Sequence, residues 1–301
     1  MLLKLTEEIA NWQSDPSVFI KIPLAQKSIS RADAYRQIQQ LTKFINPSLS
    51  NSKHSLIIGM CFDDPKNWIV ALISALASKM IYVPIPKEFS DVQIKSFIPN
   101  LDLILTDSQK NMNRFKAIYN GIEMVNRQAA EDCSELFLLQ LENDSVRADM
   151  GLPTNAVAVI HTSGSTSNPK GVVISWQGLS AVVSSMLERT APLGKIHYVS
   201  VLPYSLLLEQ ILGILLPILT KGSISILPQD MDCYTGTQTD IDAYIFTVKA
   251  SDANFTMLPP SFLSHLQKLV MNLTKTPNEI LGSSIEVIAT GGAPGFAARL
   301  I

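Results

Sequence analysis

The sequence predicts an α/β protein with two stacked lobes that contain mostly parallel sheets. Short runs of β-branched and apolar residues alternate with segments of helix length along the chain, and this alternation is typical of α/β layers. Several runs are apolar at consecutive positions, as in Ala156–Ile160. Strands that are buried on both faces of a parallel sheet show this pattern. A chain of 301 residues is also long enough for two domains.

The individual elements follow from these runs and from their flanking residues. The expected strands are Ser55–Met60, Ile81–Ile85, Leu103–Thr106, Ala156–His161, Gly171–Ser175, His197–Leu202, Ser223–Leu227, Asn254–Leu258 and Ile285–Ala289. The expected helices are Pro65–Ser78, Ser90–Ile98, Trp176–Thr190, Leu206–Leu219, Thr239–Ala250, Pro260–Met271 and Gly295–Ile301. The helix at Pro65 has the clearest start, because Asp63 and Asp64 precede it as capping residues and proline fits a first turn.

Two polar stretches that contain glycine and proline are candidate boundaries between parts of the chain. They are Asn143–Asn155 and Ala191–Lys195. The second is the preferred junction. It divides the chain into a first lobe over residues 1–194, which begins with a helical segment, and a second lobe over residues 195–301.

Composition and charge exclude several classes of protein. Hydrophobic residues make up 47% of the chain and charged residues 17%, whereas disordered chains combine low hydrophobicity with high net charge. The net charge is −2, and the Lys and Arg residues form no cluster. A nucleic-acid partner is therefore not expected, since phosphate contacts need clustered cations.

Cysteine usage and hydropathy give expectations about location. The chain has three cysteines, far apart and without a CxxC pair: Cys61, Cys133 and Cys233. A cytoplasmic location is expected, because neither a disulfide framework nor a zinc site fits this pattern. The most apolar window, Leu206–Leu219, has 14 residues and contains Glu209. A transmembrane helix needs about 20 apolar residues, so the window is expected to be a buried helix and no transmembrane segment is expected.

The segment His161–Gly171 (HTSGSTSNPKG) carries most of the candidate chemistry. It contains five hydroxyl side chains, two glycines and one lysine, and it connects two expected strands. Backbone N–H groups and hydroxyls in such a turn suit phosphate oxygens. Lys170 adds a positive charge, and Thr166 is suited to a Mg²⁺ that the phosphates carry.

Two other interpretations of this segment were weighed. The Walker motif GxxxxGK[ST] is excluded, because Pro169 stands at its second glycine and Gly171 follows the lysine. An ordinary polar surface turn stays open, since Ser, Thr and Gly are common between strands. His161 is expected to be a packed residue at the end of its strand and not a catalytic base.

Residues Thr162–Val172 (TSGSTSNPKGV) closely resemble the phosphate-binding signature TSGSTGxPKGV of the adenylate-forming superfamily. This superfamily includes acyl-CoA synthetases, fatty-acyl-AMP ligases and the adenylation domains of peptide synthetases. Four further segments resemble its motifs in the same order: Ile81–Pro86 (IYVPIP), Leu202–Glu209 (LPYSLLLE), Met257–Ser261 (MLPPS) and Gly291–Pro294 (GGAP). The resemblance extends from about Ala25 to the last residue and implies an acyl-CoA synthetase-like N-terminal domain.

The resemblance implies an acid–thiol ligase that uses ATP and Mg²⁺. A carboxylic acid is activated as an acyl-adenylate and then passed to a thiol, either CoA or the phosphopantetheine of an acyl carrier protein. Lys170 and Thr166 have the implied catalytic roles, and Thr166 also faces the metal. The implied nucleotide-binding residues are Thr162, Ser163, Gly164, Ser165, Thr166, Lys170, Gly171, Gly291, Gly292, Ala293 and Pro294. The implied acyl pocket contains Tyr204, Leu206 and Glu209, although Glu209 could equally face solvent.

The sequence also departs from the family pattern. Ser167 stands where the signature has the glycine that follows Thr166, and Leu206 stands where the LPxxHxxE motif has histidine. Leu206 favours an apolar or fatty acid, and the two departures together favour an alternative function, an inactive short form that binds nucleotide or acyl groups. The family's later motifs are not found in these 301 residues. The chain is therefore expected to be the front part of a larger enzyme, and the chain in isolation is expected to have no turnover.

Overall fold

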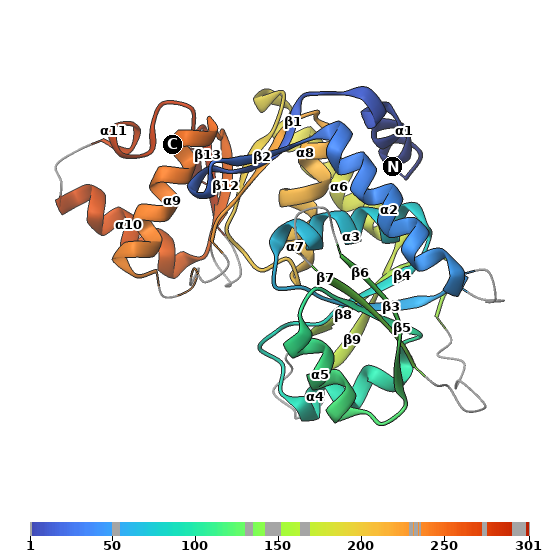
Figure 1. Ribbon diagram of the computed structural model, residues 1–301. Helices are drawn as coiled ribbons and strands as arrows, with labels where there is room; N and C mark the ends of the chain where they lie inside the picture. Colours follow the sequence, from blue (N-terminus) through green and yellow to red (C-terminus); the bar gives the residue numbers. More distant parts are fainter. Residues whose placement is uncertain are drawn as a thin grey trace. The chain divides into compact units, whose positions relative to one another are not determined.

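The computed structural model confirms the α/β class and describes residues 2–49, 55–129, 135–141, 152–162, 169–228, 231, 234, 236–272, 276–290 and 299–300. The chain forms two compact units (Figure 1). Unit 1 contains residues 3–35 and 183–301, and unit 2 contains residues 36–182. Each unit contains one seven-stranded sheet.

Unit 1 is built from the two ends of the chain. Strand β1 (Val18–Ile22) pairs in parallel with β11 (Ser223–Ile226), and β2 (Lys27–Ser30) extends the edge in antiparallel fashion. Figure 1 shows these two N-terminal strands in blue. The units therefore differ from the lobes expected on either side of Gly194, because the N-terminal segment pairs with a strand about 200 positions later.

The sheet of unit 1 has the strand order β14-β13-β12-β10-β11-β1-β2. Its remaining strands are β10 (His197–Ser200), β12 (Phe255–Leu258), β13 (Val287–Thr290) and β14 (Arg299–Leu300). Apart from β2 and β14, neighbouring strands run in parallel. The helix expected at Gly295–Ile301 is wrong for Arg299 and Leu300, since their backbone pairs with the edge strand β13.

Unit 2 has the strand order β6-β7-β5-β3-β4-β8-β9. Its strands are β3 (Ile57–Cys61), β4 (Ile81–Pro84), β5 (Leu103–Thr106), β6 (Ile122–Ala129), β7 (Glu135–Leu141), β8 (Ala156–Thr162) and β9 (Lys170–Ser175). Every residue of β3, β4 and β5 is buried. This agrees with the consecutive apolar positions, since a central parallel strand is covered on both faces.

Helices alternate with the strands along most of the chain. They are α1 (Leu2–Ala10), α2 (Arg31–Leu49), α3 (Pro65–Ala77), α4 (Asp91–Phe97), α5 (Gln109–Ile118), α6 (Trp176–Thr190), α9 (Gln238–Ser251), α10 (Pro260–Asn272) and α11 (Pro277–Leu281), with short 3₁₀ turns at Asn11–Ser14, Pro23–Ala25, Ile98–Asn100 and Ala191–Leu193. In unit 2, α4 and α5 lie side by side (Figure 1). Helix α6 has the bounds that the sequence predicts, and Asp64 caps α3 as expected.

The apolar window at Leu206–Leu219 folds as a buried but irregular helix. It consists of α7 (Leu207–Gln210), a π-helical turn (Ile211–Leu215) and α8 (Leu216–Leu219). Every residue from Glu209 to Ile218 is buried. Among the residues that the structure describes, no helix is long and apolar enough to cross a membrane.

A buried arginine ties the N-terminal segment to the rest of unit 1. Arg31 is 2% exposed, and its guanidinium donates a hydrogen bond of 2.6 Å to the Gly222 carbonyl. The guanidinium carbon lies 4.9 Å from the centre of the Trp12 ring. Asp15 and Glu8 form ion pairs with it at 3.6 and 3.8 Å. The charge is thus buried with partners, as a buried cation requires.

Candidate functional site

The two ends of the serine- and threonine-rich segment meet at the mouth of a β-hairpin. Strands β8 and β9 pair in antiparallel register, with Thr162 opposite Lys170 and His161 opposite Gly171. The Thr162 hydroxyl donates a hydrogen bond of 3.5 Å to the Lys170 carbonyl, and both side chains are exposed. Thr162 and Lys170 are directly opposite each other, so their side chains lie on the same face of the hairpin, and the exposed lysine is suited to an anion at this mouth.

Several predicted nucleotide-binding residues lie outside the described residues. They are Ser163, Gly164, Ser165 and Thr166 in the loop of the hairpin, and Gly291, Gly292, Ala293 and Pro294 after β13. Ser167 lies outside them as well. Thr162, Lys170 and Gly171 are the predicted nucleotide-binding residues within the described part of the chain.

Gly171 allows β9 to approach a histidine closely. A Cβ atom at this position would lie 2.9 Å from Val159 Cγ1 and 3.2 Å from His161 Nε2, which is closer than a side chain tolerates. The His161 ring stacks on Phe97, with 4.1 Å between ring centres and 22° between ring planes. Burial lowers the pKa of His161 to about 4. His161 is therefore a packed, neutral residue at pH 7, as expected, and Gly171 makes room for it.

The implied Mg²⁺ would be held by phosphates and by Thr166. Among them, no group of three or more His, Cys, Asp or Glu side chains is placed to hold a metal ion. Thr166, the residue expected to face the metal, is not one of them. Lys170 is exposed, and its ammonium fits phosphate oxygens. Mg²⁺ is usually bound to a protein together with such phosphates.

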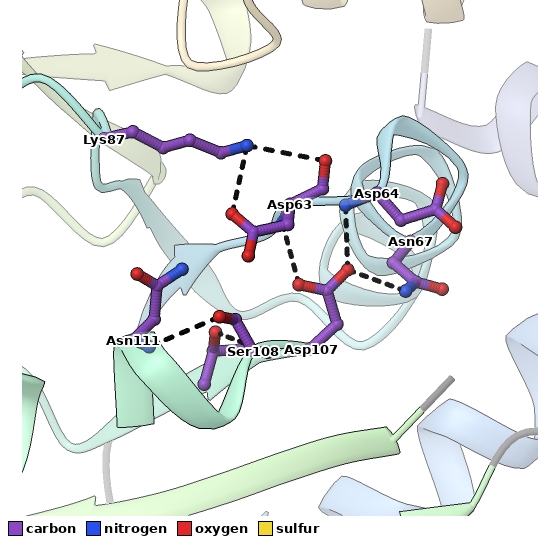
Figure 2. Close-up of polar contacts among 8 residues, drawn as sticks. Asp63, Asp64, Asn67, Lys87, Asp107, Ser108 and Asn111 are labelled. Carbon is purple, nitrogen blue, oxygen red and sulfur yellow. Dashed lines mark hydrogen bonds and ion pairs between the residues drawn. The ribbon is translucent and has the colours of Figure 1, made fainter. Parts of the chain in front are cut away.

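A second polar cluster lies at the carboxyl ends of β3 and β5, two neighbouring parallel strands (Figure 2). The Asp107 carboxylate accepts hydrogen bonds from the backbone N–H groups of Asp63 and Asp64, at 2.7 and 2.9 Å, and from Asn67 Nδ2 at 2.8 Å. Asp64 in turn caps α3 by accepting the Lys66 N–H at 2.8 Å. Asp107 thus holds the loop that leads from β3 into α3. The sequence indicated the cap but not Asp107.

Asp63 belongs to the same cluster but faces Lys87. The Lys87 ammonium lies 3.1 Å from the Asp63 carboxylate, and both side chains are 46% exposed. Burial raises the pKa of Asp63, but hydrogen bonds from Lys87, Ser108 and Asn111 outweigh it and leave the pKa below its usual value. Ligands of α/β proteins often bind at the carboxyl ends of strands. Here, however, backbone and side-chain donors already engage the carboxylates, so the cluster is structural.

The expected acyl-pocket residues lie on the turn after β10 and on α7, within unit 1. Tyr204 is 6% exposed and Leu206 is 39% exposed. Glu209 is fully buried, so its solvent-facing alternative is wrong. Its carboxylate accepts hydrogen bonds from the hydroxyls of Tyr198 and Ser200 at 2.9 and 2.5 Å. Burial, partly opposed by these bonds, raises the pKa of Glu209 to about 8.

One neighbour of Glu209 is a functional candidate that the sequence did not indicate. Gln210 is 1% exposed and donates a hydrogen bond of 2.8 Å from Nε2 to the Tyr204 carbonyl. In the sequence, Gln210 is recognisable as a candidate because it is a polar residue inside the largely apolar window Leu206–Leu219. Its partner was not visible in the sequence, because the bond depends on how the turn is folded.

Curated relatives match parts of the chain. FR901469 synthetase of Dothideomycetidae sp. (strain 11243) is 27% identical over 231 residues, which is 71% of this chain and 1% of that protein. Tyrocidine synthase 1 of Brevibacillus parabrevis is 21% identical over 243 residues, which is 80% of this chain and 20% of that protein. The chain therefore spans a small part of the length of the relatives it matches.

Solved structures share the fold. ATP-bound MatB from Rhodopseudomonas palustris superposes with a TM-score of 0.68 at 14% identity, over 95% of this chain and 55% of that chain. The o-succinylbenzoate CoA synthetase MenE from Bacillus subtilis, in complex with its acyl-adenylate OSB-AMP, gives a TM-score of 0.67 at 12% identity, over 97% of this chain and 68% of that chain. The family model described as AMP-binding enzyme matches residues 6–297, and this chain therefore belongs to the AMP-binding enzyme family.

Proposed function

We propose that the chain is the nucleotide- and acid-binding part of an ATP-dependent, AMP-forming ligase. A carboxylate oxygen attacks the α-phosphorus of ATP, the bond to the bridging oxygen of the β-phosphate breaks, and pyrophosphate leaves. The acyl-adenylate then transfers its acyl group to a thiol and releases AMP. Family membership supports the reaction class. In such chemistry the protein contributes mainly positioning and charge stabilisation.

The observation that carries this proposal is the pairing of Thr162 with Lys170 at the mouth of the β8–β9 hairpin. Thr162 and Lys170 flank the segment that contains Ser163, Ser165 and Thr166 in the sequence, so the lysine charge is available to a phosphate that this segment binds. We assign the β- and γ-phosphates to these side chains and to Lys170. Mg²⁺, when bound, neutralises phosphate charge, and Thr166 is the residue assigned to it. Gly291–Pro294 are assigned to the adenine side of the site.

The proposed acid has an apolar acyl group. Leu206 is the exposed apolar side chain of the turn after β10, and Tyr204 lies beside it in the chain. Fatty acids and apolar amino acids both fit this description. Nonribosomal peptide synthetases are also among the relatives of the chain, which supports the phosphopantetheine of a carrier protein as the acceptor alongside CoA.

The test is pyrophosphate exchange by the protein as its complete gene encodes it. Radioactive pyrophosphate is exchanged into ATP in the presence of separate panels of fatty acids, apolar amino acids and aromatic acids. We expect exchange with one class of acid. Lys170→Ala should lower it by about a hundredfold or more, the usual loss when a phosphate-stabilising donor is removed. Lys95→Ala, at an exposed lysine of α4, is the matched control and should keep full exchange.

A binding function without catalysis is the second candidate. Two residues favour it, Ser167 in place of a signature glycine and Leu206 in place of a motif histidine. Calorimetric titration with ATP and AMP distinguishes the two functions. Nucleotide binding without exchange for any acid would support the second candidate and contradict the ligase. Equal exchange in Lys170→Ala and in the native protein would contradict the assignment of the loop.

A further inference from the structure

Two consecutive polar side chains are buried at the start of an otherwise apolar helix. Glu209 is 0% exposed and Gln210 is 1% exposed, while the rest of Leu206–Leu219 is almost entirely apolar. Burying a polar group is costly unless hydrogen bonds replace its water, and burying a carboxylate costs more. The partners of these side chains therefore indicate why they stand here.

Glu209 holds the first half of the turn that follows β10. Besides the hydroxyls of Tyr198 and Ser200, the backbone N–H groups of Val201 and Leu202 donate to its carboxylate. The hydroxyls belong to the strand, and the backbone donors are the first residues after it. The carboxylate thus joins the end of β10 to the start of the turn.

Gln210 holds the second half of the same turn. Its Nε2 donates to the Tyr204 carbonyl at 2.8 Å. The Leu206 N–H donates to the Pro203 carbonyl at 3.0 Å, and the Leu206 carbonyl accepts the Gln210 N–H at 3.2 Å. The backbone of Leu206 is therefore held on both sides, by the bond to Pro203 before it and by the bond to Gln210 after it. Its own side chain, at 39% exposure, is the accessible one.

The helix is shaped to leave room for the Glu209 carboxylate. A Cβ atom at Gly213 would lie 3.1 Å from Glu209 Oε1 and 3.1 Å from Tyr198 Cε1. Gly213 is the middle residue of the π-helical turn, which begins directly after Gln210. Such turns are uncommon in helices and are frequent at functional sites. The hydrogen bonds of Glu209, the absence of a side chain at Gly213 and the π-helical turn therefore all keep the Glu209 carboxylate in its place beside Tyr198.

We infer that Glu209 and Gln210 are positioning residues, which fix the turn Val201–Leu206 and so the place of Leu206 against the acyl group of the substrate. The inference rests on the proposed ligase function for its substrate, but the fixed turn is a property of the chain alone. Neither residue is assigned a step in the chemistry. The expected signature is therefore a change in the binding and choice of the acid, with the handling of ATP retained.

The kinetic test compares Glu209→Gln and Gln210→Leu with the control Glu188→Gln, at an exposed residue of α6. KM for the acid and KM for ATP are measured by pyrophosphate exchange with the protein as its complete gene encodes it. In both test variants we expect KM for the acid to rise by about tenfold, and the order of preference among acids to change, with KM for ATP within about twofold of the native value. An unchanged KM for the acid, or equal rises for acid and ATP, would overturn the inference.

A second test works without any activity. Amide hydrogen exchange of the Val201–Leu206 segment should become at least about tenfold faster in Glu209→Gln, because an amide NH2 group, itself a donor, replaces one of the two oxygens that accept the hydrogen bonds of the turn. The amides of β5 in unit 2 should keep their native rates. If Glu209→Gln does not fold, Ser200→Ala removes one donor and keeps the carboxylate, and a smaller acceleration of the same segment is expected. Native exchange rates in the turn would overturn the inference even if the ligase function stands.

Discussion

The Arg31 guanidinium donates a hydrogen bond of 2.6 Å to the carbonyl of Gly222, although 191 positions separate the two residues. Arg31 begins α2, and Gly222 immediately precedes β11. Because β11 is also the strand that pairs with β1, this bond and the strand pairing connect the same two parts of unit 1. The N-terminal segment is thus anchored by a charge as well as by a strand.

Replacing Arg31 by Met should destabilise unit 1. The substitution keeps much of the side-chain volume but leaves Asp15 and Glu8 without their buried cation. The Gly222 carbonyl also loses its charged donor. Because the Asp15 side chain is 36% exposed and Glu8 keeps Lys221 at 3.8 Å, the expected loss is about 2 kcal/mol in the free energy of unfolding. Urea unfolding followed by circular dichroism measures this loss. Arg189→Met, at an exposed arginine of α6, should change the free energy of unfolding by less than about 0.5 kcal/mol; equal effects of the two substitutions would contradict the prediction.

Removing Asp107 should loosen the entry into α3. Asp107→Ala leaves three donors, two of them backbone N–H groups, without their acceptor. The expected loss is about 2 kcal/mol in the free energy of unfolding.

A surface ion pair provides the comparison for Asp107. Asp91 pairs with Arg114 at 2.7 Å, but its side chain is 66% exposed. Asp91→Ala should therefore cost less than about 1 kcal/mol. Thermal unfolding measures the loss of stability in both variants. A larger loss in Asp91→Ala than in Asp107→Ala would show that Asp107 does not hold the loop.

A side chain at Gly171 should disturb the β8–β9 hairpin. The new Cβ in Gly171→Ala must displace Val159 or the His161 ring, which is itself stacked on Phe97. Overpacking of this kind costs about 1–3 kcal/mol. Thermal unfolding measures the cost, and pyrophosphate exchange measures the effect on the proposed site.

Gly178 in α6 provides the control for this substitution. A Cβ there would lie 3.3 Å from the Ser175 hydroxyl, a side chain that can move, and alanine favours a helix. Gly178→Ala should therefore leave stability unchanged or improved. A loss equal to that of Gly171→Ala would mean that the contact with His161 is not the cause.

The buried Glu209 should make stability depend on pH. Burial raises its pKa from 4.5 to about 8. Between these values the folded chain holds a proton that the unfolded chain has released, so the free energy of unfolding falls as the pH rises. The expected slope is on the order of 1 kcal/mol per pH unit for this one group. Glu209→Gln cannot release a proton, and its stability relative to the native chain should improve from about pH 5 to about pH 8.

Urea unfolding at a series of pH values measures both profiles. Other groups titrate in this range, so the informative quantity is the difference between the native chain and the variant at each pH. Parallel profiles would contradict a proton on Glu209 in the folded state. Glu188→Gln, at an exposed carboxylate, should give a profile parallel to that of the native chain.

The sequence was most informative where local pattern decides structure. Strands β3, β4 and β5 are buried on both faces, and their apolar runs have no competing interpretation. Strands β1 and β2 are not among the strands that the sequence predicts, because they are only partly buried and lack a continuous apolar run. The strand β6 is also a poor match to the buried pattern, since its sequence IEMVNRQA is half polar. These strands form because of partners that the local sequence does not indicate.

The same distinction applies to the candidate site. The hydroxyl-rich segment with Lys170 is recognisable because its residues are consecutive. The roles of Asp107 and Gln210 depend on contacts made after folding, with the N–H groups of the loop before α3 and with the Tyr204 carbonyl. For Glu209, the sequence left two alternatives open. A carboxylate near the start of a helix can face solvent, or it can be buried where hydrogen-bond donors surround it.

The division of the two sheets along the chain has a consequence for biosynthesis. Unit 2 is one uninterrupted stretch, residues 36–182, and its sheet can form as soon as that stretch leaves the ribosome. Strand β1 has to wait until β11 has been made, because its partner Ile224 follows Ile20 by about 200 positions. Until then β1 can pair with β2 but has no parallel partner, so the sheet of unit 1 closes after the stretch that forms unit 2 has been made.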